Sequence, residues 1–335
     1  MNIKRIFVFI LACVLLSVCL VSCKKDVDES ATGETAPEMC TIKFNSNCNI
    51  VIEPKNIVKG EKIGEPEEPV YEGFVFDGWY NKANNLKWDF AFDKVAGDMT
   101  LYAKWLEPKD VFKFQQIDDE TAEITGVLKE AQYLQIPSEI GGYAVTGIAD
   151  NAFSKSSSEI YKKITIPESV TIIGERAFEG CAGIEIVVEG ALRRVGEWAF
   201  DGCTGLKSVT FDENVELIAP ESFQSTGLTF VYIPESVQAI EENAFSDCAD
   251  LQRVILHAKN ISILDSAFRD SGIKAVYFYG EEDEVDALFD ERVEPFNDSF
   301  VNAFVYIYSE TEPEIDTGYD GFWYFDGKGQ TRIWP

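Results

Sequence analysis

The sequence predicts a mainly β protein with short helical or 3-10 corners, in which a small sheet module precedes a solenoid of stacked coils. Two observations support this fold class. A short phrase recurs, as GERAFEGC at 174–181, GEWAFDGC at 196–203 and EENAFSDC at 241–248. Ahead of it, residues 40–106 are rich in β-branched and aromatic residues separated by turn residues, which is typical of strands. The 335 residues, 46% of them hydrophobic, allow more than one packed core.

The first 23 residues have the features of a secretory signal. Lys4 and Arg5 precede an apolar run at 6–21, whose 16 residues fall short of the about 20 that a membrane-spanning helix needs. The run ends in LVSC at 20–23, which resembles the bacterial lipobox. That resemblance implies cleavage before Cys23 and lipid attachment to it, and several acyl chains on one residue give stable anchoring. The alternative is an ordinary signal in which Cys23 is incidental.

The chain is strongly acidic, with a formal charge of −29. Loss of Lys4 and Arg5 with the signal lowers the 29 basic residues to 27, against 58 acidic residues. Such a surface repels phosphate backbones and anionic headgroups, so we expect no nucleic-acid partner and no membrane contact besides the anchor. The expected organisation is a signal peptide at 1–22, a flexible tether at 23–39, the sheet module at 40–106, the solenoid at 107–279 and a capping segment at 280–335.

In the module, CTIKF at 40–44 alternates like a half-buried strand, and IVIEP at 50–54 predicts a second strand after an intervening turn. Two aromatic clusters follow, and their pattern resembles the Listeria–Bacteroides repeat, the B-repeat type of internalin-like surface proteins. The resemblance implies a small β-grasp-like fold that serves as a module or spacer, sometimes in protein contacts. The residues that carry it are Gly73, Phe74, Phe76, Gly78, Trp79, Tyr80, Trp88, Phe90, Thr100, Leu101, Tyr102, Ala103, Lys104 and Trp105.

Trp79, Trp88 and Trp105 of the module have two interpretations. They form either an aromatic platform for carbohydrate or the core of a small sheet, and we favour the core.

Six phenylalanines mark the coils of the solenoid, with spacings of 25, 22, 23, 22 and 23 residues. Each follows an Ala or Ser directly and an aliphatic residue five positions earlier. A period of 20–29 residues is that of a leucine-rich-repeat coil, which cannot enclose its own apolar side, so stacked coils share one core and pair their strands in parallel. The six are Phe153, Phe178, Phe200, Phe223, Phe245 and Phe268.

The segments ITIPESVTIIGERAF at 164–178 and VYIPESVQAIEENAF at 231–245 resemble the BspA-type leucine-rich repeats of oral and gut bacteria and spirochetes. The pattern departs at 187–194, where VVEGALRR lacks the Ile-Pro corner, and after Phe153, where SKSSSEIYKK lengthens the coil. BspA-like relatives act as adhesins, so the resemblance implies binding of host matrix proteins or of proteins on other bacteria.

Cys181, Cys203 and Cys248 share one position, three residues after the phenylalanine of their coil. Stacked side chains point the same way, which disfavours a disulfide between Cys181 and Cys203, and the chain has no CxxC pair for a metal site. We interpret the three as buried free thiols, with a bridge between Cys181 and Cys203 left open.

The C-terminal segment is expected to close the solenoid, because the last coil of such an array needs an end plate. NAFVYIYSETEP at 302–313 predicts a strand, and EEDEVDALFDERVEP at 281–295 is an acidic candidate helix. The segment resembles the closing part of other BspA-type arrays, and we interpret Trp323 and Trp334 as core of this cap rather than as a ligand platform.

The sequence contains no motif for catalysis. Any Ser–His–Asp or Cys–His arrangement would have to use the one histidine, His257, and no GxSxG, HExxH or GxGxxG motif is present. A carboxylate pair of the glycosidase type is not excluded by composition. We expect a protein that is not an enzyme, with no catalytic residue, no cofactor and no metal.

The expected function is that of a bacterial cell-envelope lipoprotein, anchored to the outer membrane and exposed at the surface, that binds protein partners through its solenoid. Two alternatives stay open: a periplasm-facing structural or assembly lipoprotein, and a carbohydrate-binding protein. The sequence does not define the oligomeric state. The candidate outward row consists of the residue that follows the second aliphatic position in each coil, namely Glu185, Lys207, Thr229, Gln252 and Lys274.

Overall fold

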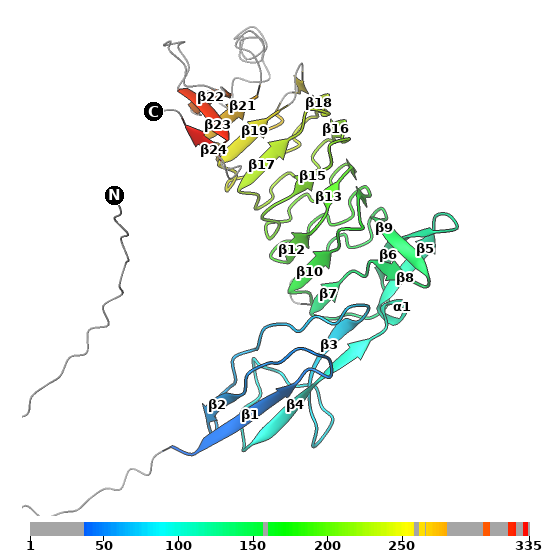
Figure 1. Cartoon of the computed structure of the whole chain (residues 1–335), viewed down its shortest axis with the longest axis vertical. Coiled ribbons are helices and arrows are strands. Elements are labelled where there is room, and N and C mark those ends of the chain that lie inside the picture. The colour runs from blue at the N-terminus through cyan, green and yellow to red at the C-terminus, as the bar shows by residue number, and fades with distance from the viewer. Residues whose placement is uncertain are drawn as a thin grey trace, which may run out of the picture. The chain divides into compact units, whose positions relative to one another are not determined.

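The computed structural model describes residues 37–156, 160–257, 261–264, 266–279, 304–308, 321–325 and 331–333. Within these ranges the chain is almost entirely β, and the one helix is α1, Pro108–Val111 (Figure 1). The predicted mainly β fold class is confirmed. Met39–Pro335 form one compact unit. The predicted signal, Cys23 and most of the tether lie outside the described residues.

The module is a four-stranded mixed sheet with the order β2-β1-β4-β3. The central pair, β1 at Met39–Asn45 and β4 at Met99–Leu106, is parallel. The edge strands, β2 at Lys55–Val58 and β3 at Val75–Asn81, are antiparallel to their neighbours. A parallel centre flanked by two antiparallel pairs is the strand arrangement of the β-grasp-like fold that the resemblance implies.

Aromatic residues fill the core of the module. Trp79 is 2% exposed and Trp88 is 9% exposed. Trp105 packs against the same cluster and donates its Nε1–H to the Ser46 carbonyl, at 2.8 Å. Because Trp79 and Trp88 are buried members of this core, the core interpretation is confirmed for both.

The loop between β1 and β2 is longer than predicted. Residues 50–54 form no strand, and the antiparallel register instead places Ile42 opposite Lys55. Pro54 has no N–H to give to the ladder, so pairing begins at the residue after it. The strand predicted at 50–54 is therefore wrong, and the observed strand begins directly after that segment.

A hairpin closes the N-terminal end of the solenoid. β5, Phe112–Gln116, pairs antiparallel with β6, Thr121–Val127. β6 in turn pairs in parallel with β9, Tyr143–Ile148, and β8, Glu139–Ile140, folds back on β9. The hairpin covers the apolar end that the first coil would otherwise expose to water.

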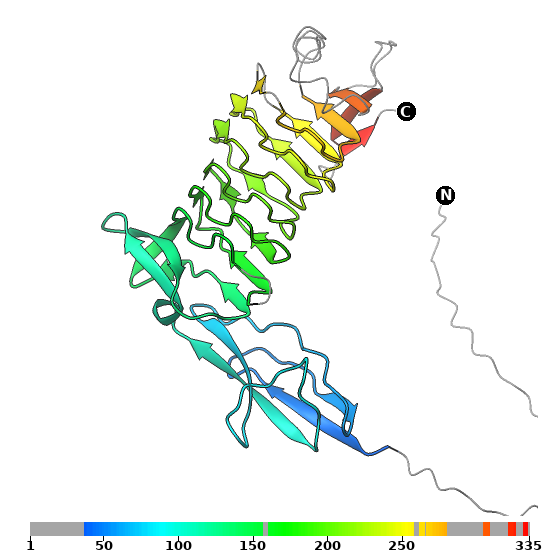
Figure 2. The ribbon, with the colours of Figure 1, turned by 180° about the vertical axis from the view of Figure 1, so that it is seen from behind.

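Parallel strands stack along two sides of the solenoid, as both views show (Figure 1 and Figure 2). One side has two-residue strands: β11 at Ile172–Ile173, β14 at Arg194–Val195, β16 at Leu217–Ile218, β18 at Ala239–Ile240 and β20 at Ser262–Ile263. The outer surface of the longer strands is called the strand face. These strands are β7 at Tyr133–Gln135, β10 at Lys163–Ile166, β12 at Glu185–Val188, β17 at Phe230–Ile233, β19 at Arg253–Leu256 and β21 at Ala275–Phe278.

The strand face is interrupted between β12 and β17. There β13, Ala191–Leu192, pairs with β15, Thr210–Phe211, while a single bridge joins Ile186 to Leu206. The interruption coincides with 187–194, where the sequence lacks the Ile-Pro corner of the other coils. The departure in sequence therefore changes strand pairing without breaking the stack.

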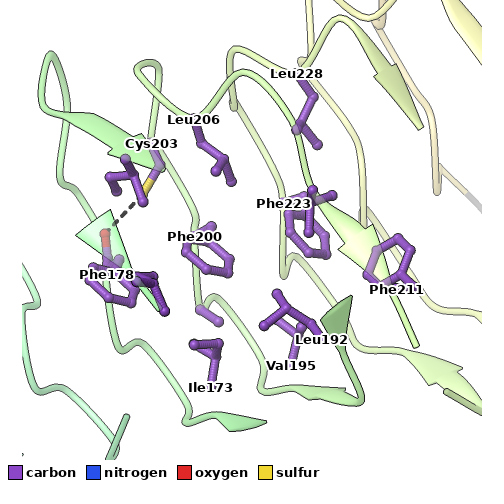
Figure 3. Packing of buried hydrophobic residues seen from close by; sticks show 14 of the residues in the cluster. Ile173, Phe178, Leu192, Val195, Phe200, Cys203, Leu206, Phe211, Phe223 and Leu228 are labelled. Atoms are coloured by element: carbon purple, nitrogen blue, oxygen red, sulfur yellow. Dashed lines mark hydrogen bonds between the residues drawn. The ribbon is translucent and has the colours of Figure 1, made fainter. Parts of the chain in front are cut away.

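The six repeat phenylalanines form one buried column, as predicted. Neighbouring ring centroids lie 5.0, 5.2, 5.5, 5.3 and 5.1 Å apart, and their planes are within 14° of parallel. Phe153 is 2% exposed and the other five are fully buried. Figure 3 shows Phe178, Phe200 and Phe223 between two aliphatic rows, with Leu206 and Leu228 on one side and Ile173 and Val195 on the other.

The corner that carries each phenylalanine consists of hydrogen-bonded β-turns and not of the short helical or 3-10 segment that the sequence predicts. Their i→i+3 hydrogen bonds include the N–H of Cys181 to the Phe178 carbonyl, at 3.1 Å. Left-handed residues lie two positions before and two after the phenylalanine, with φ of 54° at Arg176 and 74° at Gly180. They stop a right-handed helix from continuing. The equivalent residues are Asn151, Trp198, Glu221, Asn243 and Ser266 before it, and Lys155, Gly202, Ser225, Asp247 and Asp270 after it.

Among the described residues after the last coil, three segments form strands. β22, Phe304–Tyr308, adds to β21 in parallel, which confirms the strand predicted at 302–313. β23, Gly321–Phe325, pairs in parallel with β22, and β24, Thr331–Ile333, ends the sheet antiparallel. The candidate helix at 281–295, Trp334 and the side chain of Trp323 lie outside the described residues.

Candidate binding face of the solenoid

Residues alternate between the core and the strand face along each strand. β17, β19 and β21 pair in register, so Tyr232, Ile255 and Tyr277 are direct neighbours across the three strands. The residues on either side of these three, Val254 among them, belong to the phenylalanine core. A second set of side chains is thereby assembled on the outer side of the same strands.

This second set is apolar, and its central members are buried in a core cluster of their own. Ile255, Ala275 and Tyr277 are 5–9% exposed, and the rings of Tyr277 and Tyr306 stack 5.2 Å apart. Neighbouring strands contribute partly buried rings to the cluster. The cluster is called the aromatic patch and consists of Phe230, Tyr232, Ile255, Ala275, Tyr277, Tyr279 and Tyr306.

Polar groups are held in place along the aromatic patch. Tyr232 Oη lies 2.7 Å from His257 Nδ1, and the imidazole meets the Tyr279 ring edge-on at 4.1 Å. The Arg253 guanidinium lies 5.5 Å from the centre of the Phe230 ring. Burial, with the charges of Glu213 and Glu235, raises the pKa of Tyr232, so its hydroxyl stays protonated at neutral pH. These groups offer donors and cationic contacts beside an apolar surface.

The structure brings four of the five predicted row residues together. All five are exposed. The N–H of Thr229 donates to the Lys207 carbonyl (3.4 Å), that of Gln252 to Thr229 (3.1 Å) and that of Lys274 to Gln252 (2.9 Å). Glu185 lies instead on β12, beyond the interruption, with its carboxylate 3.3 Å from Lys163 Nζ. The four connected residues are called the polar row.

The polar row borders the aromatic patch, because Thr229, Gln252 and Lys274 each directly precede the first residue of β17, β19 or β21. Sequence reasoning found the row but missed the patch. The signal was present in FVYIP, AVYFYG and FVYIYS, where both alternating sets of residues are apolar. A strand with one face exposed to solvent would have polar residues at every second position.

The column of cysteines has a structural role. Cys181, Cys203 and Cys248 are buried and unbridged, as interpreted from the sequence. Cys203 Sγ–H donates to the Phe178 carbonyl one coil earlier, at 3.1 Å (Figure 3). Burial raises the pKa of the Cys203 and Cys248 thiols, so both remain protonated donors at neutral pH. The described residues contain no group of three or more side chains that could hold a metal ion.

The described part of the chain also contains no helix that is long and apolar enough to span a membrane.

Two family models match this chain, one in each of its parts. Residues 132–252 and 183–287 match the family described as BspA type leucine rich repeat region, in six copies, and residues 41–104 match the Listeria–Bacteroides repeat domain. The chain is similar to internalin H of Listeria monocytogenes, with 53% identity over 47 residues. It is also similar to a Gly-rich membrane protein of Evansella cellulosilytica, with 44% identity over 66 residues.

These two matches cover 13% and 19% of this chain, but only 9% and 8% of the relatives, so the chain spans less than a tenth of the length of either relative. Among solved structures, the leucine-rich repeat protein TpLRR of T. pallidum is 27% identical, with a TM-score of 0.40. That likeness covers 51% of this chain and 85% of TpLRR.

Proposed function

We propose that this protein is a bacterial cell-envelope lipoprotein, exposed at the surface, that binds protein partners through its strand face. Support comes from the similarity of its two parts to the Listeria–Bacteroides repeat domain and the BspA-type leucine-rich repeat region. The family is one of surface proteins whose repeats are typically binding rather than enzymatic modules. The partner class follows the BspA-type resemblance: matrix proteins of a host, or surface proteins of other bacteria.

The observation that carries the proposal is the exposed polar row beside the partly exposed rings of the aromatic patch, whose central residues are buried. Protein interfaces combine aromatic residues and Arg at their centre with a polar, hydrogen-bonding border. The strand face offers both over four neighbouring strands, with Arg253 beside the aromatic side chains. An extended surface built on paired strands suits another folded protein better than a small molecule, which needs an enclosing cavity.

Binding is tested with two variants of the full mature chain that carry the same change in charge. Thr229→Glu combined with Gln252→Glu alters the polar row. Gln238→Glu combined with Ser262→Glu alters exposed residues of neighbouring coils on the opposite side, where the N–H of Ser262 donates to the Gln238 carbonyl at 2.9 Å. Immobilised matrix proteins and intact cells of other bacteria serve as probes.

The expected result is saturable binding that the polar-row variant loses at least 10-fold while the opposite-side variant keeps it, because buried charge without a partner is costly in an interface. Equal loss in both variants would reject the strand face as the binding surface. Binding to glycan but to no protein would reject the protein-binding proposal.

The anchor and its exposure are tested separately. We expect metabolic labelling with palmitate to mark the wild-type chain and not Cys23→Ala, and protease added to intact cells to digest the wild type. Labelling of both variants would contradict attachment at Cys23. A protein that survives until the outer membrane is broken would favour the periplasm-facing alternative.

A further inference from the structure

Part of the strand face is covered by the module itself. Residues 65–70 are called the strap. Together with the first three strands of the strand face they line a cavity of about 630 Å³ that is open to solvent on one side. The outward residues that line it from β7, β10 and β12 are Tyr133, Gln135, Lys163, Thr165, Glu185 and Val187.

Several contacts hold the strap and its module against the solenoid. The Glu65 carboxylate lies 2.8 Å from Lys162 Nζ, which directly precedes β10. Val75, at the start of β3, belongs to the hydrophobic core of the solenoid rather than to that of the module. Pro66 and Pro69 fix φ at two of the six strap residues, so the strap reaches the strand face as a stiff segment.

Glu68 is the strap residue with the most unfavourable surroundings. It faces Lys163 of β10, Glu185 of β12 and Glu65 of its own segment. The two nearby ammonium groups already have carboxylate partners, because Lys163 pairs with Glu185 at 3.3 Å and Lys162 pairs with Glu65. The other titratable groups that line the cavity are Tyr133, Glu67 and Glu189.

Burial raises the pKa of Glu68 from 4.5 to about 7. The Lys163 charge opposes the rise, and the charges of Glu185 and Glu65 add to it. A carboxyl group of this kind is mostly protonated at pH 5.5 and mostly ionised at pH 8, whereas a solvated glutamate is ionised at both.

We propose that the strap is a proton-linked latch, which rests on β7, β10 and β12 while Glu68 is protonated and lifts from them as Glu68 ionises. The docked strap holds more protons than the released one, because the pKa of Glu68 is higher when docked. Docking is therefore strongest below pH 4.5, weakens as the pH rises from there to about 7, and changes no further above it. The proposal does not depend on what the strand face binds.

The latch is tested by the accessibility of a residue beneath it. Thr165→Cys places a thiol in the cavity, and Thr210→Cys places one at an exposed outward position of β15 that the strap does not reach. The measured quantity is the labelling ratio, which is the rate of maleimide labelling of the thiol in Thr165→Cys divided by the rate for the thiol in Thr210→Cys. Taking this ratio cancels the intrinsic pH dependence of the thiol reaction. Peptide mass spectrometry separates these sites from the native cysteines.

We expect the ratio to rise roughly 10- to 30-fold between pH 5.5 and pH 8, the change in release that the shifted pKa of Glu68 produces. Glu68→Gln, which keeps the neutral shape at every pH, removes the rise. Glu67→Gln, at an exposed neighbour on the same strap, keeps it.

Two further variants give opposite shifts that a merely structural effect would not produce. Lys163→Met removes the cation that lowers the pKa, so the midpoint of the labelling ratio moves to higher pH. Glu185→Gln removes a carboxylate that raises the pKa, so the midpoint moves to lower pH. A ratio that does not change with pH, or a wild-type response in Glu68→Gln, would overturn the latch, as would shifts of the same sign in both variants.

Discussion

The module and the solenoid pack their aromatic rings in two different ways. In the module, the Trp79 ring meets Phe44 at 73° and Phe76 at 69°, edge to face. In the solenoid, six phenylalanines stack within 14° of parallel. Both arrangements are favourable for isolated rings, so pairwise preference does not decide between them.

The path of the backbone determines how the rings are oriented relative to one another. Each coil repeats the path of the previous one, so every repeat phenylalanine leaves the chain in the same direction and takes the same orientation. The module has no such repeat, and each of its rings occupies a unique site. A substitution in the solenoid is therefore expected to affect the two neighbouring coils, whereas one in the module's own core, such as at Trp79, should affect only the module.

The largest expected effect separates these two modes directly. Phe200→Ala should lower the free energy of unfolding by about 3–5 kcal/mol, because it empties a fully buried site in the middle of the column. Combined with Phe223→Ala, it should show a coupling energy of about 0.5–3 kcal/mol, since the rings are in contact. Combined with Trp79→Ala, the effects should add within about 0.5 kcal/mol.

Urea unfolding followed by circular dichroism measures all three combinations. A coupling energy between Phe200 and Trp79 as large as that between Phe200 and Phe223 would show that coupling does not depend on contact between stacked coils.

A glycine gives the next largest effect. A Cβ on Gly205 would overlap the Ile184 carbonyl of the neighbouring coil, so Gly205→Ala should cost about 1–3 kcal/mol through the shift of backbone that it forces. Gly97→Ala in the module, where nothing lies within 4 Å of the new atom, should change stability by less than about 0.5 kcal/mol. Thermal unfolding compares the two, and equal losses would show that close coil stacking is not the cause.

The cysteine column should respond to loss of its hydrogen bond. Cys203→Ala leaves the buried Phe178 carbonyl without its side-chain donor and should cost about 1–2 kcal/mol. Cys203→Ser should cost less, because Ser271 already fills the equivalent role by donating to the Phe245 carbonyl at 2.6 Å. Denaturant midpoints give the order, and a serine variant less stable than the alanine variant would refute it.

The smallest effects come from the left-handed positions. Gly202 and Ser225 occupy equivalent places, with φ of 73° and 54°. Gly202→Ser should destabilise and Ser225→Gly should stabilise the chain, each by about 0.5–1 kcal/mol, because side chains disfavour this conformation. Differential scanning calorimetry resolves such shifts, and changes of the same sign would count against the equivalence of the two corners.

Much of the solenoid could be predicted from the sequence because its constraint is periodic. The phenylalanine column, the cysteine column and the row from Lys207 to Lys274 each follow from one spacing repeated along the chain. Predictions that rested on a single local pattern fared less well. The strand at 50–54 has suitable residues, but pairing in β2 begins only after Pro54.

The left-handed corners show why sequence alone could not complete the picture. Gly180 and Gly202 are recognisable candidates for positive φ, but Lys155, Ser225 and Asp247 adopt the same conformation without that signal. Stacking against the neighbouring coil imposes the path on them.

The number of coils, the residues inside them and the apolar character of both sides of β21 follow from the sequence alone, because hydrophobic burial depends on which residues recur and at what interval. Two features depend on the folded chain: Glu185 lies beyond the interruption, apart from the rest of its row, and Glu68 lines the same cavity as Lys163, nearly a hundred positions away in the chain. Such arrangements depend on how the module packs against the solenoid and on how neighbouring coils pair, and neither is visible as a periodicity in the sequence.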